Sequence, residues 1–233
     1  MAVRQRMSRA LGVIGLTALA AGCADDGVSL HAVCPIAPEL TEGACVYDPG
    51  SDVCVGDGVL NVAAASSYRL NLKVESGLKS RMRDVPLLAE TNGMQITSAE
   101  VELRVPSGGV INLPETKIGD VVYPRLDNPL RVSATGYLDP QGSVVVPVVI
   151  FGSEYVRRFA AATNLSQIVA AVTLHGKTNG DEEVESGEFN WPIRLITANP
   201  AQVGGECQET SYCASSFGQD SFAQACRDSN ASD

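Results

Sequence analysis

Seven cysteines are the residues whose chemistry this sequence constrains most tightly. Six of them form two groups of three, one near each end of the chain: Cys34, Cys45, Cys54, Cys207, Cys213 and Cys226. In an exported protein an even number of cysteines predicts disulfides, here three. Because each group holds an odd number, complete pairing needs at least one bridge between the two groups. That bridge would close a very long loop, worth about 4–5 kcal/mol in the chain-entropy model.

The same cysteines are poorly spaced for a metal centre. No CxxC pair occurs, and only His31 and His175 could add nitrogen ligands. A metal site is therefore not predicted. The two histidines are also weak candidates for catalysis, because a Ser-His-Asp hydrolase needs a histidine beside a nucleophile, and no GxSxG turn accompanies either one.

Paired carboxylates are the remaining catalytic possibility, because a glycosidase needs two acids across a cleft. The acids that would share one strand face or one turn are Glu100, Glu102, Asp181, Glu182 and Glu183. Solvated surface charge is the simpler interpretation of both groups.

Three further patterns have structural interpretations. Asp48, Asp52 and Asp57 offer oxygen ligands to calcium, but their spacing is not that of an EF-hand. Gly56-Asp57-Gly58 lacks the third glycine of a dinucleotide-binding loop and predicts a turn before a strand. Trp191 shares its strand face with other apolar residues, so we expect it in the core. No cofactor is predicted.

The first residues indicate export. A tip with three arginines precedes an apolar run over 10–21 that is too short to span a bilayer. The run ends in Leu19-Ala20-Ala21-Gly22-Cys23. This pattern resembles the bacterial lipobox, which implies cleavage before Cys23, a diacylglyceryl group on its thiol and acylation of the new amino terminus. Several acyl chains make such an anchor effectively permanent. The alternative is an ordinary secretory signal that leaves Cys23 as an odd thiol.

Charge and the residues after Cys23 bear on location and partners. In some bacteria acidic residues directly after the lipid-bearing cysteine change which membrane retains a lipoprotein. Here Asp25 and Asp26 begin one position late, so we expect the outer membrane. Cleavage would leave 211 residues with 14 basic and 27 acidic side chains, a net charge of about −13. This charge argues against nucleic acid as a partner.

Between the two cysteine groups, polar and apolar residues alternate with a period of two, which places every second side chain on a buried face. The alternating segments are 68–74, 99–105, 130–134, 168–174 and 189–195. Residues 144–151 are apolar on both faces, which predicts a central strand, with a bulge or a local loss of pairing at Pro147.

Turn and cap signals organise the later strands. Asn179-Gly180 predicts a hairpin between 168–174 and 189–195. Pro192 lacks a ladder donor, so its strand should lie at an edge or pair with one neighbour near that point. A helix is predicted over 153–163, with Ser153 able to cap it.

Together these elements predict an all-β fold, an immunoglobulin-like antiparallel β-sandwich with irregular, disulfide-linked terminal segments. A jelly roll or a small open barrel would give similar periodicity. The predicted organisation is a signal peptide over 1–22, a cysteine-containing collar over 23–58, the β-sandwich over 59–200 and a cysteine-containing C-terminal segment over 201–233.

Several short motifs are similar to those of lipoproteins common in myxobacteria and related deltaproteobacteria. They are Gly58-Val59-Leu60-Asn61 before Tyr68, Glu90-Thr91-Asn92, Gly176-Lys177-Thr178, Val184-Glu185-Ser186-Gly187-Glu188-Phe189, Pro192-Ile193, and Cys213 followed by Gly218-Gln219-Asp220 before Cys226. The resemblance implies export, lipidation and a β-domain, and it transfers no active site.

The sequence thus favours a non-enzymatic lipoprotein of the bacterial cell envelope, held to the membrane by its lipid, that displays its β-sandwich to an envelope protein or a polysaccharide. Two alternatives stay open. One is an envelope glycan hydrolase that uses paired carboxylates, and the other is a structural spacer without a small ligand.

Overall fold

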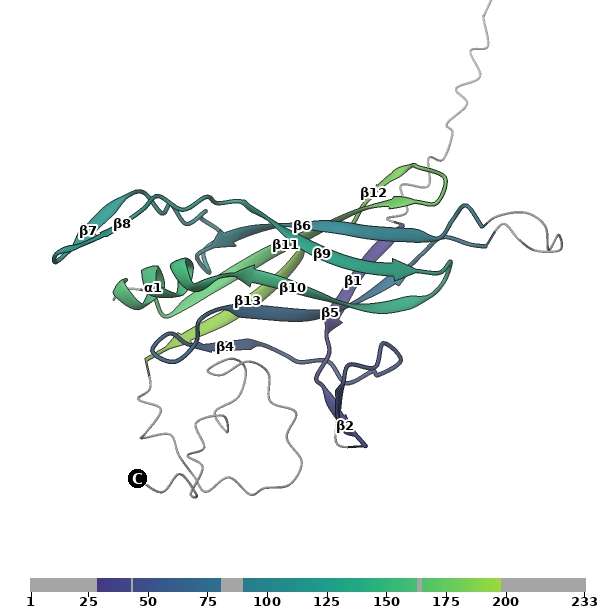
Figure 1. Ribbon diagram of the computed structural model, residues 1–233, viewed down its shortest axis with the longest axis horizontal. Coiled ribbons are helices and arrows are strands. Elements are labelled where there is room, and N and C mark those ends of the chain that lie inside the picture. The colour runs from purple at the N-terminus through teal and green to yellow at the C-terminus, as the bar shows by residue number, and fades with distance from the viewer. Residues whose placement is uncertain (1–28, 43, 81–89, 163–164, 198–233) are drawn as a thin grey trace, which may run out of the picture.

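The computed structural model of the protein describes residues 29–42, 44–80, 90–162 and 165–197. In these residues two β-sheets pack face to face around one apolar core, and one α-helix lies at an end of the sandwich (Figure 1). The predicted all-β sandwich is confirmed. Cys23, Cys207, Cys213 and Cys226 lie outside the described residues.

The smaller sheet has three strands in the order β1-β5-β10, all antiparallel. These strands are β1 (Leu30–Pro35), β5 (Tyr68–Ser76) and β10 (Ser143–Phe151). The alternation predicted for β5 is present, since Tyr68, Leu70, Leu72 and Val74 are all buried. β1 belongs to the same core, because Leu30 is fully buried. The sandwich therefore takes in part of residues 23–58.

The larger sheet has the order β4-β13-β11-β6-β9, and β12 pairs with β11 outside this path. Its strands are β4 (Gly58–Asn61), β6 (Met94–Arg104), β9 (Leu130–Leu138), β11 (Gln167–Thr178), β12 (Glu183–Glu185) and β13 (Phe189–Ile196). Every pair in it is antiparallel except β4 and β13, which are parallel.

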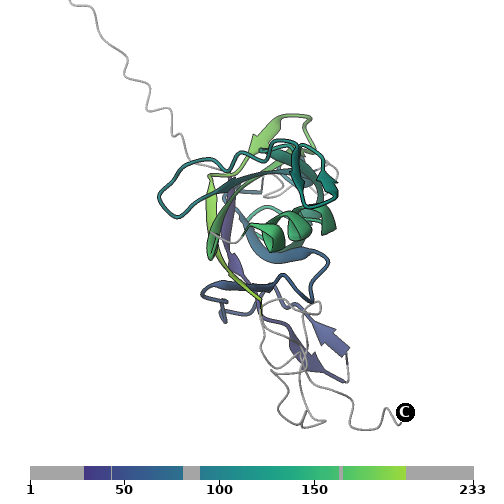
Figure 2. The same ribbon diagram turned by 90° about the vertical axis from the view of Figure 1, so that its left-hand side faces the viewer.

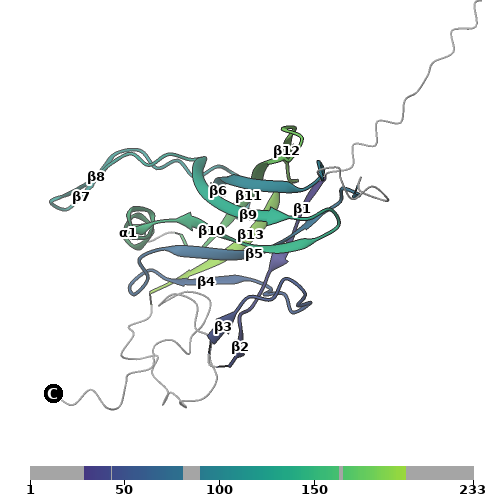
Figure 3. The ribbon, with the colours of Figure 1, turned by 45° about the vertical axis from the view of Figure 1, so that its right-hand side comes forward.

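Two short ribbons project from the sandwich. β2 (Glu39–Thr41) pairs with β3 (Ala44–Val46), and β7 (Thr116–Ile118) pairs with β8 (Val121–Tyr123). The two ribbons leave the sandwich in different directions (Figure 3). We call residues 106–129, which join β6 to β9 and carry β7 and β8, the arm.

The helix α1 (Ser153–Ala161) closes the end of the core on which the arm sits (Figure 2). It buries Val156 and Phe159, and the Phe159 ring meets that of Phe151 edge-on, with 5.3 Å between centroids. The prediction that Ser153 caps this helix is wrong. Gly152 takes the cap position in an extended conformation without a side-chain hydrogen bond, so Ser153 becomes the first helical residue.

β10 differs from its prediction as a central strand, because it hydrogen-bonds only to β5 and forms an edge of the smaller sheet. Its apolar residues are nevertheless explained, since β9 of the larger sheet lies beside it. Pro147 is tolerated here because an edge strand needs fewer ladder donors. The register shifts between Val149 and Phe151, a few residues beyond the proline.

The predictions for the later strands are confirmed with one addition. β11 pairs antiparallel with β13, and the turn at Asn179-Gly180 leads first into β12, which also pairs with β11. Pro192 lies opposite Val169 of β11, whereas the pairing of β13 with β4 begins only at Ile193. Near the proline the strand therefore has one neighbour.

A disulfide joins Cys34 of β1 to Cys54, which precedes β4. The two cysteines are 20 residues apart in sequence, so the chain-entropy model assigns the bridge about 3 kcal/mol of stabilisation. Cys45 is disulfide-bonded as well. Because Cys34 and Cys54 pair with each other, the partner of Cys45 lies outside the described residues.

Candidate functional site

The histidines considered for catalysis lie on different sheets. His31 is exposed on β1, where it stands opposite Glu75. His175 lies on β11, with its Nδ1 atom 3.7 Å from Oε2 of Glu185. Across the described residues, no three His, Cys, Asp or Glu side chains come together in a way that could hold a metal ion.

The acids on β6 belong to a network around one guanidinium. Arg104 donates from Nη1 and Nη2 to the carboxylate of Glu188, at 2.8 and 2.7 Å, and from Nε to Glu102. The hydrogen bonds from Arg104, and then from Asn190, lower the pKa of Glu188. A general acid for glycoside cleavage needs a raised pKa. These carboxylates are thus arranged as acceptors for Arg104.

The acidic turn after β11 is solvated. Asp181, Glu182 and Glu183 are exposed, and Asp181 Oδ1 lies 3.0 Å from Nζ of Lys177. This hydrogen bond raises the pKa of Lys177. The pair is the kind of surface contact that contributes little to stability.

The three aspartates considered for calcium each have a different partner. Asp48 accepts a hydrogen bond of 2.8 Å from the backbone of Gly50. Asp52 lies 3.7 Å from Nζ of Lys73, and Asp57 accepts from Arg194 at 3.2 Å. They therefore serve separate local contacts. Gly56-Asp57-Gly58 leads into β4 as predicted.

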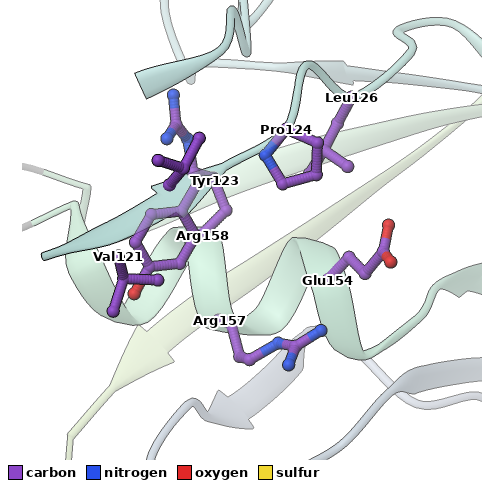
Figure 4. Close-up of a pocket in the computed structure, with 8 residues that line it drawn as sticks. Val121, Tyr123, Pro124, Leu126, Glu154, Arg157 and Arg158 are labelled. Carbon is purple, nitrogen blue, oxygen red and sulfur yellow. The ribbon is translucent and has the colours of Figure 1, made fainter. Parts of the chain in front are cut away.

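The feature that sequence reasoning missed is a cavity of about 340 Å³ between the arm and α1 (Figure 4). The arm supplies its mostly apolar wall: Val121, Val122, Tyr123, Pro124 and Leu126. The helix supplies a charged wall: Glu154, Arg157 and Arg158. The only available signal was the i, i+3, i+4 spacing of these three charges, which places them on neighbouring positions of the helix surface.

Arg158 is the unusual member of this wall. It is only 8% exposed, yet it forms no ion pair with a carboxylate of the described residues. Its Nη2 atom donates to the Pro114 carbonyl at 2.7 Å and to Oγ1 of Thr116 at 2.6 Å. Its Cζ atom lies 5.7 Å from the centroid of the Tyr123 ring, a cation–π arrangement. The Nη1 atom is buried and has no hydrogen-bond partner among the described residues.

Two further contacts fix the base of the arm. The Asn128 side chain accepts from the backbone N–H of Leu103 at 2.8 Å, and it donates to the carbonyls of Leu103 and Ile111 at 2.7 and 2.8 Å. Tyr155 of α1 donates to the Asp127 carbonyl at 2.6 Å. Burial, more than nearby charge, raises the pKa of Tyr155, so its hydroxyl stays a donor.

The tip of the arm leaves apolar side chains in solvent. Ile118, Val121 and Val122 are 40%, 55% and 59% exposed. The base of the arm is therefore held by hydrogen bonds, and its tip exposes apolar side chains. The cavity lies between the arm and the charged wall of α1.

Comparison with known proteins adds no functional information. No model of a protein family matches the chain, and no curated protein matches it in sequence. Of the helices in the described ranges, none has the length and apolar character needed to cross a membrane.

Proposed function

We propose that this chain is a non-enzymatic lipoprotein of the bacterial cell envelope, anchored through Cys23, whose β-sandwich presents the arm and α1 as its binding surface. The anchor is supported by the lipobox-like residues 19–23 and by the basic, apolar order of the residues before them. The outer membrane is the proposed location, because the acidic residues that follow Cys23 begin at Asp25.

The observation that carries the binding role is the apolar tip beside a cavity. Val121 and Val122 lie side by side on the projecting ribbon, and their exposure forgoes the stabilisation that burial would give. Exposed apolar patches mark interaction sites. A structural spacer would need neither the ribbon nor the cavity. The dedicated contacts of Asn128 and Tyr155 hold the ribbon in place, which favours a preformed surface.

The geometry of the anchor is consistent with this role. Only six residues separate Cys23 from Leu30, the first residue of β1, and they can span at most about 20 Å. In Figure 1 the start of β1 and the tip of the arm lie well apart along the long axis. A short tether would therefore keep the sandwich near the membrane and leave the arm free to meet a partner.

The glycan hydrolase has no comparable support. Of its candidate carboxylates, Glu102 accepts a hydrogen bond from Arg104, which also binds Glu188. The lowered pKa of Glu188 is the opposite of what a general acid needs.

The test of the anchor is the intact mass of the protein extracted from membranes. We expect a chain that begins at Cys23 and carries acyl mass, whereas the Cys23→Ser variant should carry none and leave the membrane fraction. Ala24→Ser is the matched control, since it changes the next residue and keeps the thiol. A wild-type chain without acyl mass would refute the anchored lipoprotein.

A further inference from the structure

We propose that Cys45 forms a disulfide with one cysteine of the C-terminal segment, and that the other two cysteines of that segment bond to each other. The bridge attaches residues 201–233 to the ribbon of β2 and β3, which lies on the side of the sandwich away from the arm (Figure 3). The inference goes beyond the proposed function, and one of its steps rests on that function because it takes Cys23 to be lipidated.

The first argument is the set of cysteines that can reach Cys45. Cys34 and Cys54 are bonded to each other, and Cys45 is disulfide-bonded as well. The described ranges hold no further cysteine, so the partner is Cys23 or one of the three cysteines near the C-terminus. A thiol that carries a diacylglyceryl group cannot form a disulfide, which removes Cys23. The partners that remain are Cys207, Cys213 and Cys226.

The second argument is the number of pairings that the observed bridge leaves. Six cysteines can pair in fifteen ways, whereas four can pair in only three. With Cys34 and Cys54 paired, the four that remain are Cys45 and the three C-terminal cysteines. Each of the three pairings joins Cys45 to the C-terminal segment. Each also leaves two cysteines in that segment, which then bond to each other.

The position of Cys45 suits a bridge to a distant segment. Cys45 is the middle residue of β3, and it is exposed. The thiol–disulfide oxidants of an exporting cell can therefore reach it. In each bridge the two thiols give up two protons and two electrons, and the disulfide of the oxidant accepts them and becomes a dithiol.

The region around Cys45 is itself held on the smaller sheet. Nζ of Lys73 on β5 donates to the Ser51 carbonyl at 3.2 Å. The backbone N–H of Ile36 donates to the carbonyl of Asn71 on β5 at 2.9 Å. A bridge to Cys45 thus joins the C-terminal segment to the sandwich through a part of the chain that the sandwich already holds.

The composition of the C-terminal segment explains why it needs such a bridge. Burial of apolar side chains is the main force that keeps a segment on a domain. Residues 201–233 have few large apolar side chains: Val203, Tyr212, Phe217 and Phe222. Exported chains that cannot build enough apolar contact commonly use disulfides in its place. Terminal segments need a tie of this kind to stay on their domain.

The test is a peptide map of the wild-type chain, extracted from membranes, alkylated without reduction and then cut after acidic residues. This cleavage places Cys45 in fragment 43–48 and the C-terminal cysteines in fragments 207–209, 210–220 and 221–228. We expect fragment 43–48 to be joined to one of these three and the other two to be joined to each other. Fragments 27–39 and 53–57, which carry Cys34 and Cys54, should be joined as the internal control.

Two variants check the assignment. Cys45→Ser should expose one new thiol per chain, and the alkylated fragment that carries this thiol identifies the former partner. Cys34→Ser is the matched control, because it removes another cysteine of the same region. It should expose the thiol of Cys54 and leave fragment 43–48 joined to the C-terminal segment. The map of the wild-type chain decides the question even if a variant does not fold.

The same digest separates this proposal from the proposed anchor. Cys45 alkylated before reduction, or joined to Cys34, to Cys54 or to a second chain, would overturn the bridge. An acylated Cys23 beside a free Cys45 would refute only the bridge. A Cys23 without acyl mass, in a chain whose Cys45 is joined to the C-terminal segment, would refute only the anchor. A bridge between Cys45 and Cys23 would refute both.

Discussion

The indole Nε1 atom of Trp191 donates a hydrogen bond of 2.9 Å to the hydroxyl of Tyr68, and this contact joins the two sheets inside the core. Tyr68 is fully buried and Trp191 is 3% exposed. Gly58 of β4 packs directly against both polar atoms, and a β-carbon at this position would collide with them. The prediction that Trp191 belongs to the core is thus confirmed, with a polar function added to its packing.

This contact predicts a non-additive pair of substitutions. Tyr68→Phe removes the acceptor of a buried indole N–H and should cost about 1–3 kcal/mol in the free energy of unfolding. Trp191→Phe should cost more, because it also leaves a cavity. In the double variant the loss of the bond is counted once, so the total should fall short of the sum of the two single losses. Urea unfolding of the four proteins measures this, and strict additivity would show that the bond contributes nothing.

Asn128 predicts a specific loosening of the arm. Asn128→Asp keeps the size of the side chain but replaces its donor nitrogen with an oxygen that faces the carbonyls of Leu103 and Ile111. We expect a loss of about 2–3 kcal/mol, together with faster tryptic cleavage at Lys117 and Arg125 in the arm. Asn190→Asp is the control, because Asn190 is exposed. Equal cleavage rates for wild type and Asn128→Asp would contradict the role of Asn128 as the clamp of the arm.

Glu188 predicts a dependence of stability on pH. Its pKa in the folded protein is lowered from 4.5 by the hydrogen bond from Arg104. A lowered folded pKa means that the carboxylate stabilises the fold above about 4.5 and that this contribution is lost as the pH falls further. Glu188→Gln should therefore lose less thermal stability than wild type between neutral and acid pH.

The measurement is the melting temperature from neutral pH to well below 4.5, in low and high salt. Glu100→Gln is the matched control, since Glu100 is exposed on β6, the strand that carries Arg104, and has no ion pair with Arg104. Salt should shrink the difference between wild type and Glu188→Gln, because the pair with Arg104 is partly solvent-exposed. Identical pH profiles for wild type and Glu188→Gln would exclude the pair as a source of acid sensitivity.

The elements that the sequence predicts well are those with one buried face. β5 and β11 show this, because a strand whose alternate residues enter the core carries the pattern in its own composition. The two apolar faces of residues 144–151 predict a central position for β10. Its real position depends on β9, a neighbour in the other sheet, and no local pattern contains that information.

The candidate site could not be predicted for the same reason. The apolar residues of 106–126 follow neither the spacing of a strand nor that of a helix. The cavity forms only because α1 packs against the arm. In the sequence Arg158 resembles any charged residue on the surface of a helix. Only the fold shows that Thr116 and Tyr123 contact its guanidinium group. Asn128 likewise looks like a turn residue, although its amide takes the place of a neighbouring strand beside Leu103.

The parallel pairing of β4 with β13 determines when the domain can be completed. Gly58 of β4 pairs with Ile193 of β13. β4 is the first strand of the larger sheet in the sequence and β13 is the last, so β4 cannot pair until nearly the whole sandwich has been synthesised. Pairing over such a distance in sequence is slow, because the intervening chain must be ordered first. A chain that threads through a narrow translocation pore has to stay unfolded during passage. For the exported lipoprotein proposed above, the late arrival of β13 would keep the larger sheet open until passage is almost finished, which would favour translocation over premature folding.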